Sequence, residues 1–428
     1  MSVTPQALGM SAQAMTMSPP SPPSPPSPPS PPSPPSLLSR YSMPIGYHVI
    51  HPNVSLNFQM NRWFGLVGDV SMLDEMRTVA PRIATYADWH REFAALAQQA
   101  LAKGQMLKAA YCLRSAEFFL PAGDPQRKPM RETFVQLTRD HYGVKSGDQH
   151  RVPFADGPVR GFLPAYRFTP AQPKGVVVFC GGFDSYLEEL FLFFFWLRGA
   201  GYDVLAFEGP GQGGALFDAG LPMTHEWELP VAAVLDHFGL SDVSLIGLSM
   251  GGYFAIRAAA FEPRVQRVIA FDVFFDAFDC NLRLMPAAAR LLLPILLRLK
   301  LDVLVDALAR RAAKRSLVIE WGLNQAMHVT GTPTPAAYLH AIQRYTTAEI
   351  SSRVTQDVLL LAGSEDHYVP VAQFYKQIAA LTNTRSLTAR LFTRAESAQN
   401  HCQAGNFGLA LQVITAWLDS QGSRAQPV

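Results

Sequence analysis

The sequence predicts an α/β fold in which a mostly parallel sheet is flanked by helices. Short runs rich in β-branched residues alternate with helical segments over residues 159–271, and the alternation resumes over 357–418. This order is typical of right-handed βαβ crossovers. Residues 276–347 and the residues before 156 are instead helical in pattern. We therefore expect an α/β core at 156–428 with a helical lid insertion at about 276–347, preceded by an N-terminal helical domain at 43–155.

Residues 1–42 form a Pro/Ser-rich tail outside this pattern. Of the 34 prolines in the chain, twelve form six Pro-Pro pairs between Pro19 and Pro35, each flanked by serine. Such repeats bury little apolar surface and favour polyproline II, so we expect the tail to be disordered. It is either a docking stalk for a proline-recognising partner or an unselected low-complexity repeat, and Met43 is an alternative start.

Composition excludes several classes of function. The chain carries 36 Lys and Arg against 34 Asp and Glu, and this net charge of +2 gives no reason to expect nucleic acid or a membrane as partner. The four cysteines are widely spaced, which argues against disulfides and zinc. The longest charge-free apolar runs, 190–197 and 291–297, are shorter than a membrane span. We expect a cytoplasmic protein with a small-molecule substrate and with no cofactor and no metal, and a homodimer is compatible with the sequence.

The N-terminal domain is expected to contain an α-hairpin. From Trp63 to about Leu120 apolar residues recur every three or four positions, and Gly104 separates a helix at 86–103 from the next. A further helix is expected at 130–142.

The core elements follow as short apolar strands separated by helices. We expect strands at 159–168, 175–180, 203–207, 243–247, 265–271, 357–362 and 388–392. We expect helices up to residue 200, at 225–238, at 250–261, up to residue 381 and at about 406–418.

The most informative motif is Gly247-Leu248-Ser249-Met250-Gly251, which fits G-x-S-x-G between a predicted strand and a predicted helix. The chain must reverse within a few residues here, and side chains at 247 and 251 would collide with the adjoining elements. Ser249 is therefore the predicted nucleophile. The alternative is an ordinary strand-to-helix turn with a serine cap.

A serine nucleophile needs a base that is oriented by an acid, and in this architecture the order is Ser, acid, His. Asp366 follows the strand at 357–362, where its carboxylate could hold an imidazole, and Glu365 is the alternative acid. His401 follows the last strand and is the predicted base. His367 shares a loop with Asp366, and the remaining histidines considered lie in helical stretches: His225, His237, His328 and His340.

The oxyanion hole is predicted to use two backbone N–H groups. One is that of Met250, directly after the nucleophile. The other comes from the glycine-rich loop after the strand at 175–180, where we choose Phe183, with Gly182 as the alternative register.

Three further segments carry a resemblance to a known group of α/β-hydrolases. They are Gly181-Gly182-Phe183-Asp184-Ser185-Tyr186-Leu187-Glu188-Glu189, Phe207-Glu208-Gly209-Pro210-Gly211-Gln212-Gly213 and His401-Cys402-Gln403-Ala404-Gly405-Asn406. Together with the helical N-terminal domain, they resemble the family of 2,6-dihydroxypseudooxynicotine hydrolase, which is similar to fungal hydrolases of heptaketide pigment precursors and to FrsA-like bacterial proteins. The resemblance spans about residues 55–420.

The resemblance implies an α/β-hydrolase fold and cleavage of a carbon–carbon bond next to a ketone by a Ser-Asp-His triad without a cofactor. It also implies an active site between the N-terminal domain and the core, and we expect residues 276–347 to line the entrance as well. Cys180 departs from many α/β-hydrolases, which have His there. The predicted activity is hydrolysis of an acyl–carbon or acyl–oxygen bond in a bulky aromatic or polyketide-like molecule. Ester or thioester hydrolysis, acyl transfer, cyclisation and noncatalytic binding are the alternatives.

Overall fold

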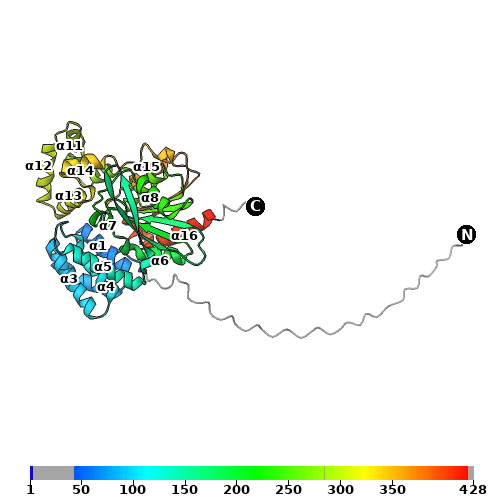
Figure 1. Cartoon of the computed structure of the whole chain (residues 1–428), viewed down its shortest axis with the longest axis horizontal. Helices are drawn as coiled ribbons and strands as arrows, with labels where there is room; N and C mark the ends of the chain where they lie inside the picture. The colour runs from blue at the N-terminus through cyan, green and yellow to red at the C-terminus, as the bar shows by residue number, and fades with distance from the viewer. Residues whose placement is uncertain (3–42, 284, 423–428) are drawn as a thin grey trace. The chain divides into compact units, whose positions relative to one another are not determined.

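The computed structural model describes residues 1–2, 43–283 and 285–422, and an eight-stranded sheet lies at the centre of this part (Figure 1). The strand order is β1-β2-β4-β3-β5-β6-β7-β8. The six strands from β4 to β8 in this order pair in parallel. β1 and β2 form an antiparallel hairpin, and β2 pairs with β4, also antiparallel. The strands are β1 (Gln149–Asp156), β2 (Val159–Phe168), β3 (Val176–Cys180), β4 (Asp203–Phe207), β5 (Val243–Leu248), β6 (Val265–Phe271), β7 (Asp357–Gly363) and β8 (Ser386–Phe392). The predicted α/β class is confirmed.

Helices cover both faces of the sheet, which explains why its central strands are apolar throughout. Side chains alternate between the two faces of a strand. Along β3, Val177 and Phe179 accordingly enter one hydrophobic core, and Val178 and Cys180 enter another. The first face packs against α6 (Phe191–Gly199) and α16 (Phe407–Gly422), and the second against α8 (Glu228–Phe238), α9 (Gly251–Ala259) and α15 (Val371–Ala380).

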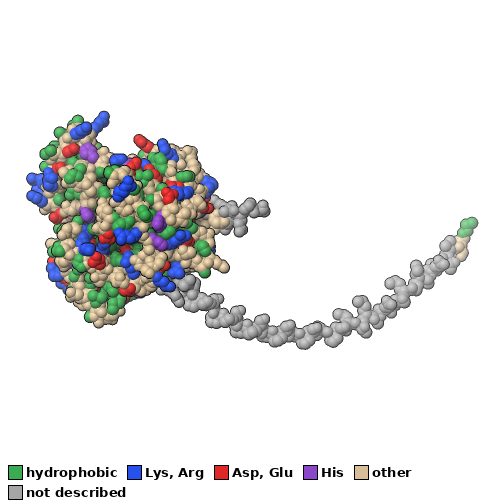
Figure 2. Space-filling view, in the orientation of Figure 1, with side chains coloured by type: hydrophobic (Ala, Val, Ile, Leu, Met, Phe, Trp, Pro, Cys, Tyr) green, Lys and Arg blue, Asp and Glu red, His purple; other side chains and the backbone are tan. Residues whose placement is uncertain are grey.

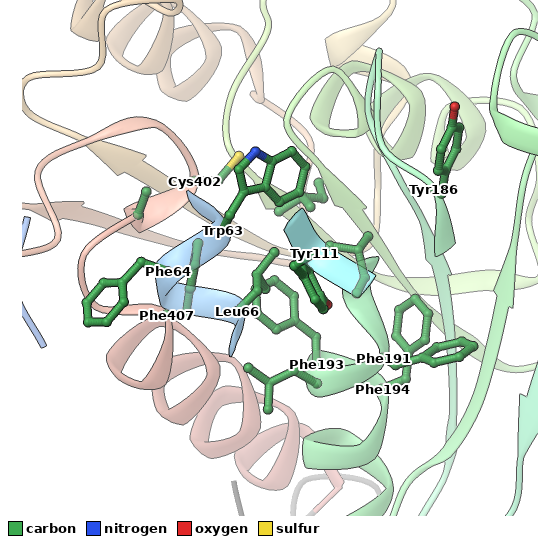
Figure 3. Close-up of a cluster of buried hydrophobic side chains, with 14 of the residues drawn as sticks. Trp63, Phe64, Leu66, Tyr111, Tyr186, Phe191, Phe193, Phe194, Cys402 and Phe407 are labelled. Carbon is green, nitrogen blue, oxygen red and sulfur yellow. The ribbon is translucent and has the colours of Figure 1, made fainter. Parts of the chain in front are cut away.

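The N-terminal helices share the first core with the sheet. They are α1 (Val54–Val67), α2 (Val70–Val79), α3 (Tyr86–Ala102), α4 (Met106–Phe118) and α5 (Arg127–Tyr142). Figure 3 shows Trp63 of α1 in the same cluster as Phe193 of α6 and Phe407 of α16. A Cβ on Gly65 would stand 2.8 Å from the Phe407 ring, so α1 packs closely on α16. The described residues from Met43 onward accordingly belong to one compact unit.

A helical insertion separates β6 from β7 and forms a lid. It contains α10 (Ala277–Arg283), α11 (Ala287–Arg298), α12 (Asp302–Ala313), α13 (Leu317–Thr330) and α14 (Pro335–Ile342). Its two ends lie side by side, because Asp276 and Thr346 form an antiparallel bridge. Leu293, Leu297 and Val305 are buried in the second core and attach the lid to the rest of the molecule.

The structure differs from the sequence prediction in the N-terminal part. β1 lies at the end of a region expected to be helical, and α1 begins at Val54, upstream of the predicted start at Trp63. β1 escaped prediction because it is an edge strand, in which only Val152 and Phe154 are buried and their neighbours in the chain are exposed. The short helix α7 (Gly213–Phe217) was also not predicted.

Two further expectations from the sequence concern membrane-spanning helices and the N-terminal tail. No helix in the described ranges combines the length and the apolar character that a membrane span requires. Except for Met1 and Ser2, the predicted tail lies outside the described residues.

Candidate active site

Ser249 lies on a sharp turn between β5 and α9. Its φ of 61° is in the left-handed region that residues with a side chain rarely adopt. A Cβ on Gly247 would stand 1.8 Å from the carbonyl oxygen of Gly251, and one on Gly251 would stand 2.8 Å from that of Gly181. Only glycine fits these positions, so the turn has the crowding and strain that G-x-S-x-G predicts.

Ser249 is one end of a hydrogen-bonded relay. Its Oγ lies 2.8 Å from His401 Nε2, and His401 Nδ1 lies 2.6 Å from Asp366 Oδ2. Asp366 follows β7, and its Oδ1 accepts hydrogen bonds from the backbone N–H groups of Tyr368 at 2.7 Å and Val369 at 2.9 Å. The structure thus brings together the three residues that the sequence places in this order, at the carboxyl ends of neighbouring strands.

A second carboxylate, which sequence reasoning missed, faces the same imidazole. Asp272 directly follows β6, and its Oδ2 lies 3.3 Å from His401 Nδ1. Backbone N–H groups of Cys402 at 3.1 Å and Val273 at 2.9 Å hold its two oxygens. The available signal was its position: β6 lies between β5 and β7, so a residue after β6 ends at the same edge of the sheet.

Burial and mutual charge set the protonation of this cluster. Burial, and then the charge of Asp272, raise the pKa of Asp366 to about 7, against the opposing effect of His401. Burial also acts to raise the pKa of Asp272, but the hydrogen bond and the charge of His401 prevail and lower it. For His401, burial opposes the cation, yet the carboxylates and above all Asp366 raise its pKa well above the usual range. The surrounding carboxylates therefore stabilise the imidazolium that forms whenever His401 takes up a proton.

The alternative acid and the other histidine of this loop lie elsewhere. Glu365 pairs with Arg394 at the surface, where 40% of its side chain and 75% of that of Arg394 are exposed. His367 lines the cavity above the relay, and its ring contacts Phe58 and Tyr368. Its Nε2 is buried and has no hydrogen-bond partner among the described residues, and burial with the nearby His401 charge lowers its pKa to about 3. His367 is therefore neutral.

The glycine-rich loop after β3 lies directly beside Ser249. A Cβ on Gly182 would stand 2.8 Å from the Ser249 Cβ, so the backbone approaches closely. The N–H of Gly182 already donates to Ser185 Oγ at 3.3 Å. Within the described ranges the N–H groups of Phe183 and Met250 form no hydrogen bond. This difference favours Phe183 over Gly182 as the donor from this loop.

The Phe207–Gly213 motif supports the same loop. The side-chain amide of Gln212 donates to the carbonyl oxygens of Gly181 at 2.7 Å and Gly182 at 2.8 Å. Glu208 accepts from the backbone N–H groups of Gly214 and Leu187, and burial raises its pKa to about 8.

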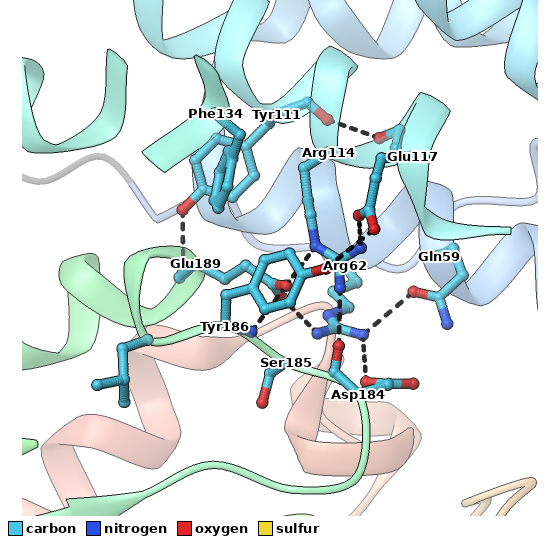
Figure 4. Close-up of polar contacts among 12 residues, drawn as sticks. Gln59, Arg62, Tyr111, Arg114, Glu117, Phe134, Asp184, Ser185, Tyr186 and Glu189 are labelled. Carbon is cyan, nitrogen blue, oxygen red and sulfur yellow. Dashed lines mark hydrogen bonds and ion pairs between the residues drawn. The ribbon is translucent and has the colours of Figure 1, made fainter. Parts of the chain in front are cut away.

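Two buried arginines of the N-terminal helices hold the other end of the loop (Figure 4). Arg114 of α4 donates to Glu189 at 2.6 Å and to the carbonyl oxygen of Asp184 at 2.7 Å. Arg62 of α1 donates to the other oxygen of Glu189 at 2.5 Å and to the Asp184 carboxylate at 3.2 Å. Glu189 also accepts from the N–H of Tyr186 at 3.1 Å. The loop that carries Phe183 is thus clamped between the core and the helical region.

The relay opens into a cavity of ≈ 810 Å³ with mostly apolar walls. Ser249 and His401 lie at its base, Phe58 and Arg62 come from α1, and the lid supplies residues such as Leu292. The N-terminal region and the lid therefore both line the cavity, as predicted.

Among the described residues one group could place three donor atoms on a cation. Asp272, His401 and Cys402 lie with their donor atoms within 4.8 Å of one another. The histidine and the carboxylate already bind each other, and burial raises the pKa of Cys402, which disfavours the thiolate that metals prefer. The chemistry of these three residues therefore fits a hydrogen-bonded relay better than a metal site.

Comparisons with known proteins agree with this architecture. The family described as serine aminopeptidase S33 matches residues 171–394, slightly more than half of the 428-residue chain. Hydrolase acrC of Aspergillus aculeatus is 28% identical over 382 residues, which cover 78% of this chain and 88% of that protein. The α/β hydrolase psoB of Aspergillus fumigatus is 28% identical over 379 residues, which cover 78% and 83%.

Solved structures show the same fold. That of 2,6-dihydroxypseudooxynicotine hydrolase has 20% sequence identity and a TM-score of 0.56, covering 83% of this chain and 94% of the other. AbyA5 has 18% identity and a TM-score of 0.62, covering 88% and 96%. With a mostly parallel sheet, a serine on a strained turn between β5 and α9 and a family match over half its length, the chain belongs to the serine aminopeptidase S33 family of α/β-hydrolases and is an enzyme of the hydrolase class.

Proposed function

We propose that this enzyme is a serine hydrolase that cleaves an acyl–carbon or acyl–oxygen bond in a bulky, largely apolar substrate. The observation that carries the proposal is the relay from Ser249 through His401 to Asp366 at the base of an apolar cavity. In this proposal Ser249 is the nucleophile, His401 the base and Asp366 the residue that orients the base.

The geometry supports a two-step acyl transfer to water. His401 Nε2 takes the proton from Ser249 Oγ as the oxygen adds to the substrate carbonyl. The N–H groups of Phe183 and Met250 stabilise the oxyanion. The protonated His401 then gives its proton to the leaving carbon or oxygen, and an acyl–serine remains. Water, deprotonated by His401, adds to the acyl carbon. The bond between this carbon and Ser249 Oγ then breaks, His401 returns the proton to Oγ, and the carboxylic acid is released.

Cleavage of an acyl–carbon bond makes one further demand, since the leaving carbanion must be stabilised as an enolate. A second carbonyl group of the substrate would supply this, together with a hydrogen-bond donor for its oxygen. His367 lines the cavity and is a neutral candidate donor, because its buried Nε2 has no hydrogen-bond partner in the described part of the chain. This arrangement supports a β-diketone-like or polyketide-like substrate.

The same relay would also serve as an esterase or thioesterase, with an alkoxide or thiolate as leaving group. The apolar walls favour one more alternative: where water is scarce, a hydroxyl or amine of the substrate itself could take the acyl group, and the product would be a transfer or cyclisation product.

A fluorophosphonate probe tests the nucleophile, and a substrate panel tests the reaction. We expect the wild-type enzyme to be labelled at Ser249 and the Ser249→Ala variant to remain unlabelled. Activity would then be measured on β-diketones, aryl esters and acyl thioesters, with release of a free acid as the readout. A Ser249→Ala variant that keeps wild-type turnover would contradict the proposed mechanism, and a cyclised product without acid release would reject hydrolysis.

A further inference from the structure

The lid carries an unusual concentration of exposed apolar side chains. We call this set of ten residues the lid surface: Leu291, Leu292, Ile295, Leu299, Leu301, Val303, Leu304, Leu308, Val318 and Ile319. Of the 21 large apolar side chains exposed in the described ranges, these ten lie within residues 291–319. Their exposure reaches 71% at Leu291 and 83% at Val303. Apolar patches of this kind on a folded protein mark an interaction site.

The lid surface does not arise from helices that fail to find a core. α11 buries Leu293 and Leu297 against the second core, as an amphipathic helix should. Leu291 and Ile295 of the same helix, and Leu299 directly after it, recur every fourth residue and are exposed. The helix is therefore apolar on a second face, which no element among the described residues covers.

Cations without ion-pair partners border the lid surface. They are Arg290, Arg298, Lys300, Arg310, Arg311, Lys314 and Arg315, and none of them forms an ion pair with a residue that the structure describes. Both acids of this segment have other partners, since Asp302 pairs with His340 and Asp306 accepts from the N–H of Ala336. Residues 287–315 carry seven cations and two acids, a net charge of +5 against +2 for the whole chain. Figure 2 shows Lys and Arg mixed with hydrophobic side chains at the left end of the molecule, where Figure 1 places α11 and α12.

The lid surface is continuous with the cavity. Leu292 and Leu308 are half exposed to solvent, at 52% and 50%, and both also line the cavity. The same holds for Val318 and Ile319 of α13. The lid surface and the wall of the cavity therefore share these four residues.

We propose that the lid surface docks on an anionic phospholipid membrane. Apolar side chains with Lys and Arg around them are the pattern of helices that lie in a membrane interface, where the acyl chains cover the former and the anionic headgroups neutralise the latter. A second copy of the chain would cover the apolar side chains, but a two-fold contact would bring two sets of unpaired cations together. An acidic protein would neutralise the cations, but the lipid surface also accommodates the protruding leucines.

The docking goes beyond the proposed reaction and does not depend on it. Only one consequence rests on the proposed function: a bulky apolar substrate that partitions into lipid would enter the cavity from the bilayer. This proposal departs from the expectation of no membrane partner, which rested on the charge of the whole chain rather than on its distribution.

Vesicle flotation of the full chain tests the docking. Vesicles of phosphatidylcholine alone are compared with vesicles that contain roughly one third phosphatidylglycerol. We expect the protein to float with the anionic vesicles and not with the neutral ones, and to be released by high salt.

One variant removes apolar side chains of the lid surface and the other removes cations beside it. Neither changes a residue of the relay. The apolar variant carries Leu291→Ser, Leu299→Ser and Val303→Ser, and the charge variant carries Arg310→Gln, Arg311→Gln and Lys314→Gln. None of these six residues lines the cavity. We expect each variant to bind the anionic vesicles at least about tenfold more weakly.

The matched control changes three apolar residues of similar exposure elsewhere, Ile45→Ser, Val49→Ser and Val70→Ser, which are exposed by 71%, 90% and 66%. It should bind like wild type, and circular dichroism should show that all variants keep the wild-type unfolding temperature. The proposal is overturned if the wild type floats with neither kind of vesicle, or if the apolar variant binds as well as the control. It is also overturned if the wild type is a lipid-free dimer that the apolar variant converts to a monomer, because a second copy then covers the lid surface.

Discussion

At the scale of single residues, the main finding is that two carboxylates face one imidazole. Asp272 and Asp366 end neighbouring parallel strands, so both reach His401 Nδ1 at the same edge of the sheet. One carboxylate suffices to orient a histidine. The second adds negative charge and stabilises the cationic form of His401, which is the form that the base adopts after it takes a proton.

This arrangement predicts a shift in the pH profile of the Asp272→Asn variant. In the proposed mechanism His401 must be neutral to act as the base, so kcat/KM should fall as the pH drops through the pKa of His401. The hydrogen bond to the Asp272 carboxylate raises that pKa, and a neutral amide weakens this effect. We expect the acid limb of the kcat/KM profile to move to lower pH by about one unit.

The control is Glu365→Gln, which also removes an acid near Asp366 but one that pairs with Arg394 at the surface. Its acid limb should coincide with that of the wild type. An Asp272→Asn profile that does not move, or moves to higher pH, would show that Asp272 has no electrostatic effect on the base.

His367 offers a second residue-scale prediction. If its Nε2 binds a second carbonyl of the substrate, His367→Phe keeps a ring of similar size and removes only the hydrogen bond. We expect kcat/KM for a β-diketone to fall about tenfold, while that for a simple aryl ester changes less than about twofold. Equal losses on the two substrates would mean that the ring only fills space.

At the scale of elements, the sequence predicts the central strands well because each is a short apolar run buried on both faces. β3, β5 and β7 begin and end within one or two residues of their predicted limits. β1 could not be predicted because half of its side chains face solvent. The position of Ser249 could be predicted because the glycines next to it in the sequence define the turn. The position of Asp272 beside His401 could not be predicted, because it depends on the order of the strands in the sheet.

The ion pairs that clamp the loop carrying Phe183 are another feature that could not be predicted from the sequence. Arg62 and Arg114 reach Glu189 across 127 and 75 residues of chain, and no spacing rule connects them. The side chain of Glu189 is fully buried and accepts from both guanidinium groups. Such a site ties α1 and α4 to the loop that carries Phe183.

We predict that Glu189→Gln destabilises the fold and slows catalysis together. The variant leaves two buried cations without a full counter-charge, and breaking a buried pair in this way costs about 3–5 kcal/mol in the free energy of unfolding. The loop should also lose its position, so kcat should fall more than KM rises. Urea unfolding and steady-state kinetics measure the two effects.

Glu132→Gln is the comparison variant, because its pair with Lys128 is exposed on the surface of α5. It should change the free energy of unfolding by less than about 1 kcal/mol and leave kcat unchanged. If Glu189→Gln resembled this variant in both measurements, the buried ion network would have no role in holding the loop.

At the scale of the whole molecule, the N-terminal helices and the sheet form one hydrophobic core. Trp63 and Phe64 of α1 lie in the same cluster as Phe193 of α6 and Phe407 of α16 (Figure 3). The sequence suggests a separate helical domain, because the change from a helical to an alternating pattern is abrupt near residue 156. The sequence does not show which apolar faces pack against each other. In the structure, this packing joins the helical region to the sheet.

The shared core predicts that the two regions unfold together. Removing α1 to α5 would expose Phe193 and Phe407 and leave Glu189 without both arginines, so a shortened chain starting at Gln149 should aggregate or remain unfolded. The full chain should unfold in urea in a single transition, with coincident curves from tryptophan fluorescence and far-UV circular dichroism. Trp63 and Trp89 report on the helical region, and Trp417 lies on α16 beside the sheet.

A chain that lacks only residues 1–42 is the control. It is shorter than the full chain but keeps every helix of the shared core. None of the residues that line the cavity or form the relay precedes Asn53, so this chain should keep the wild-type unfolding midpoint and kcat/KM. Two resolved transitions in the full chain, or a folded and active chain starting at Gln149, would show that the helical region is an independent domain after all. The single hydrophobic core that α1 shares with α6 and α16 is the physical reason to expect the single transition.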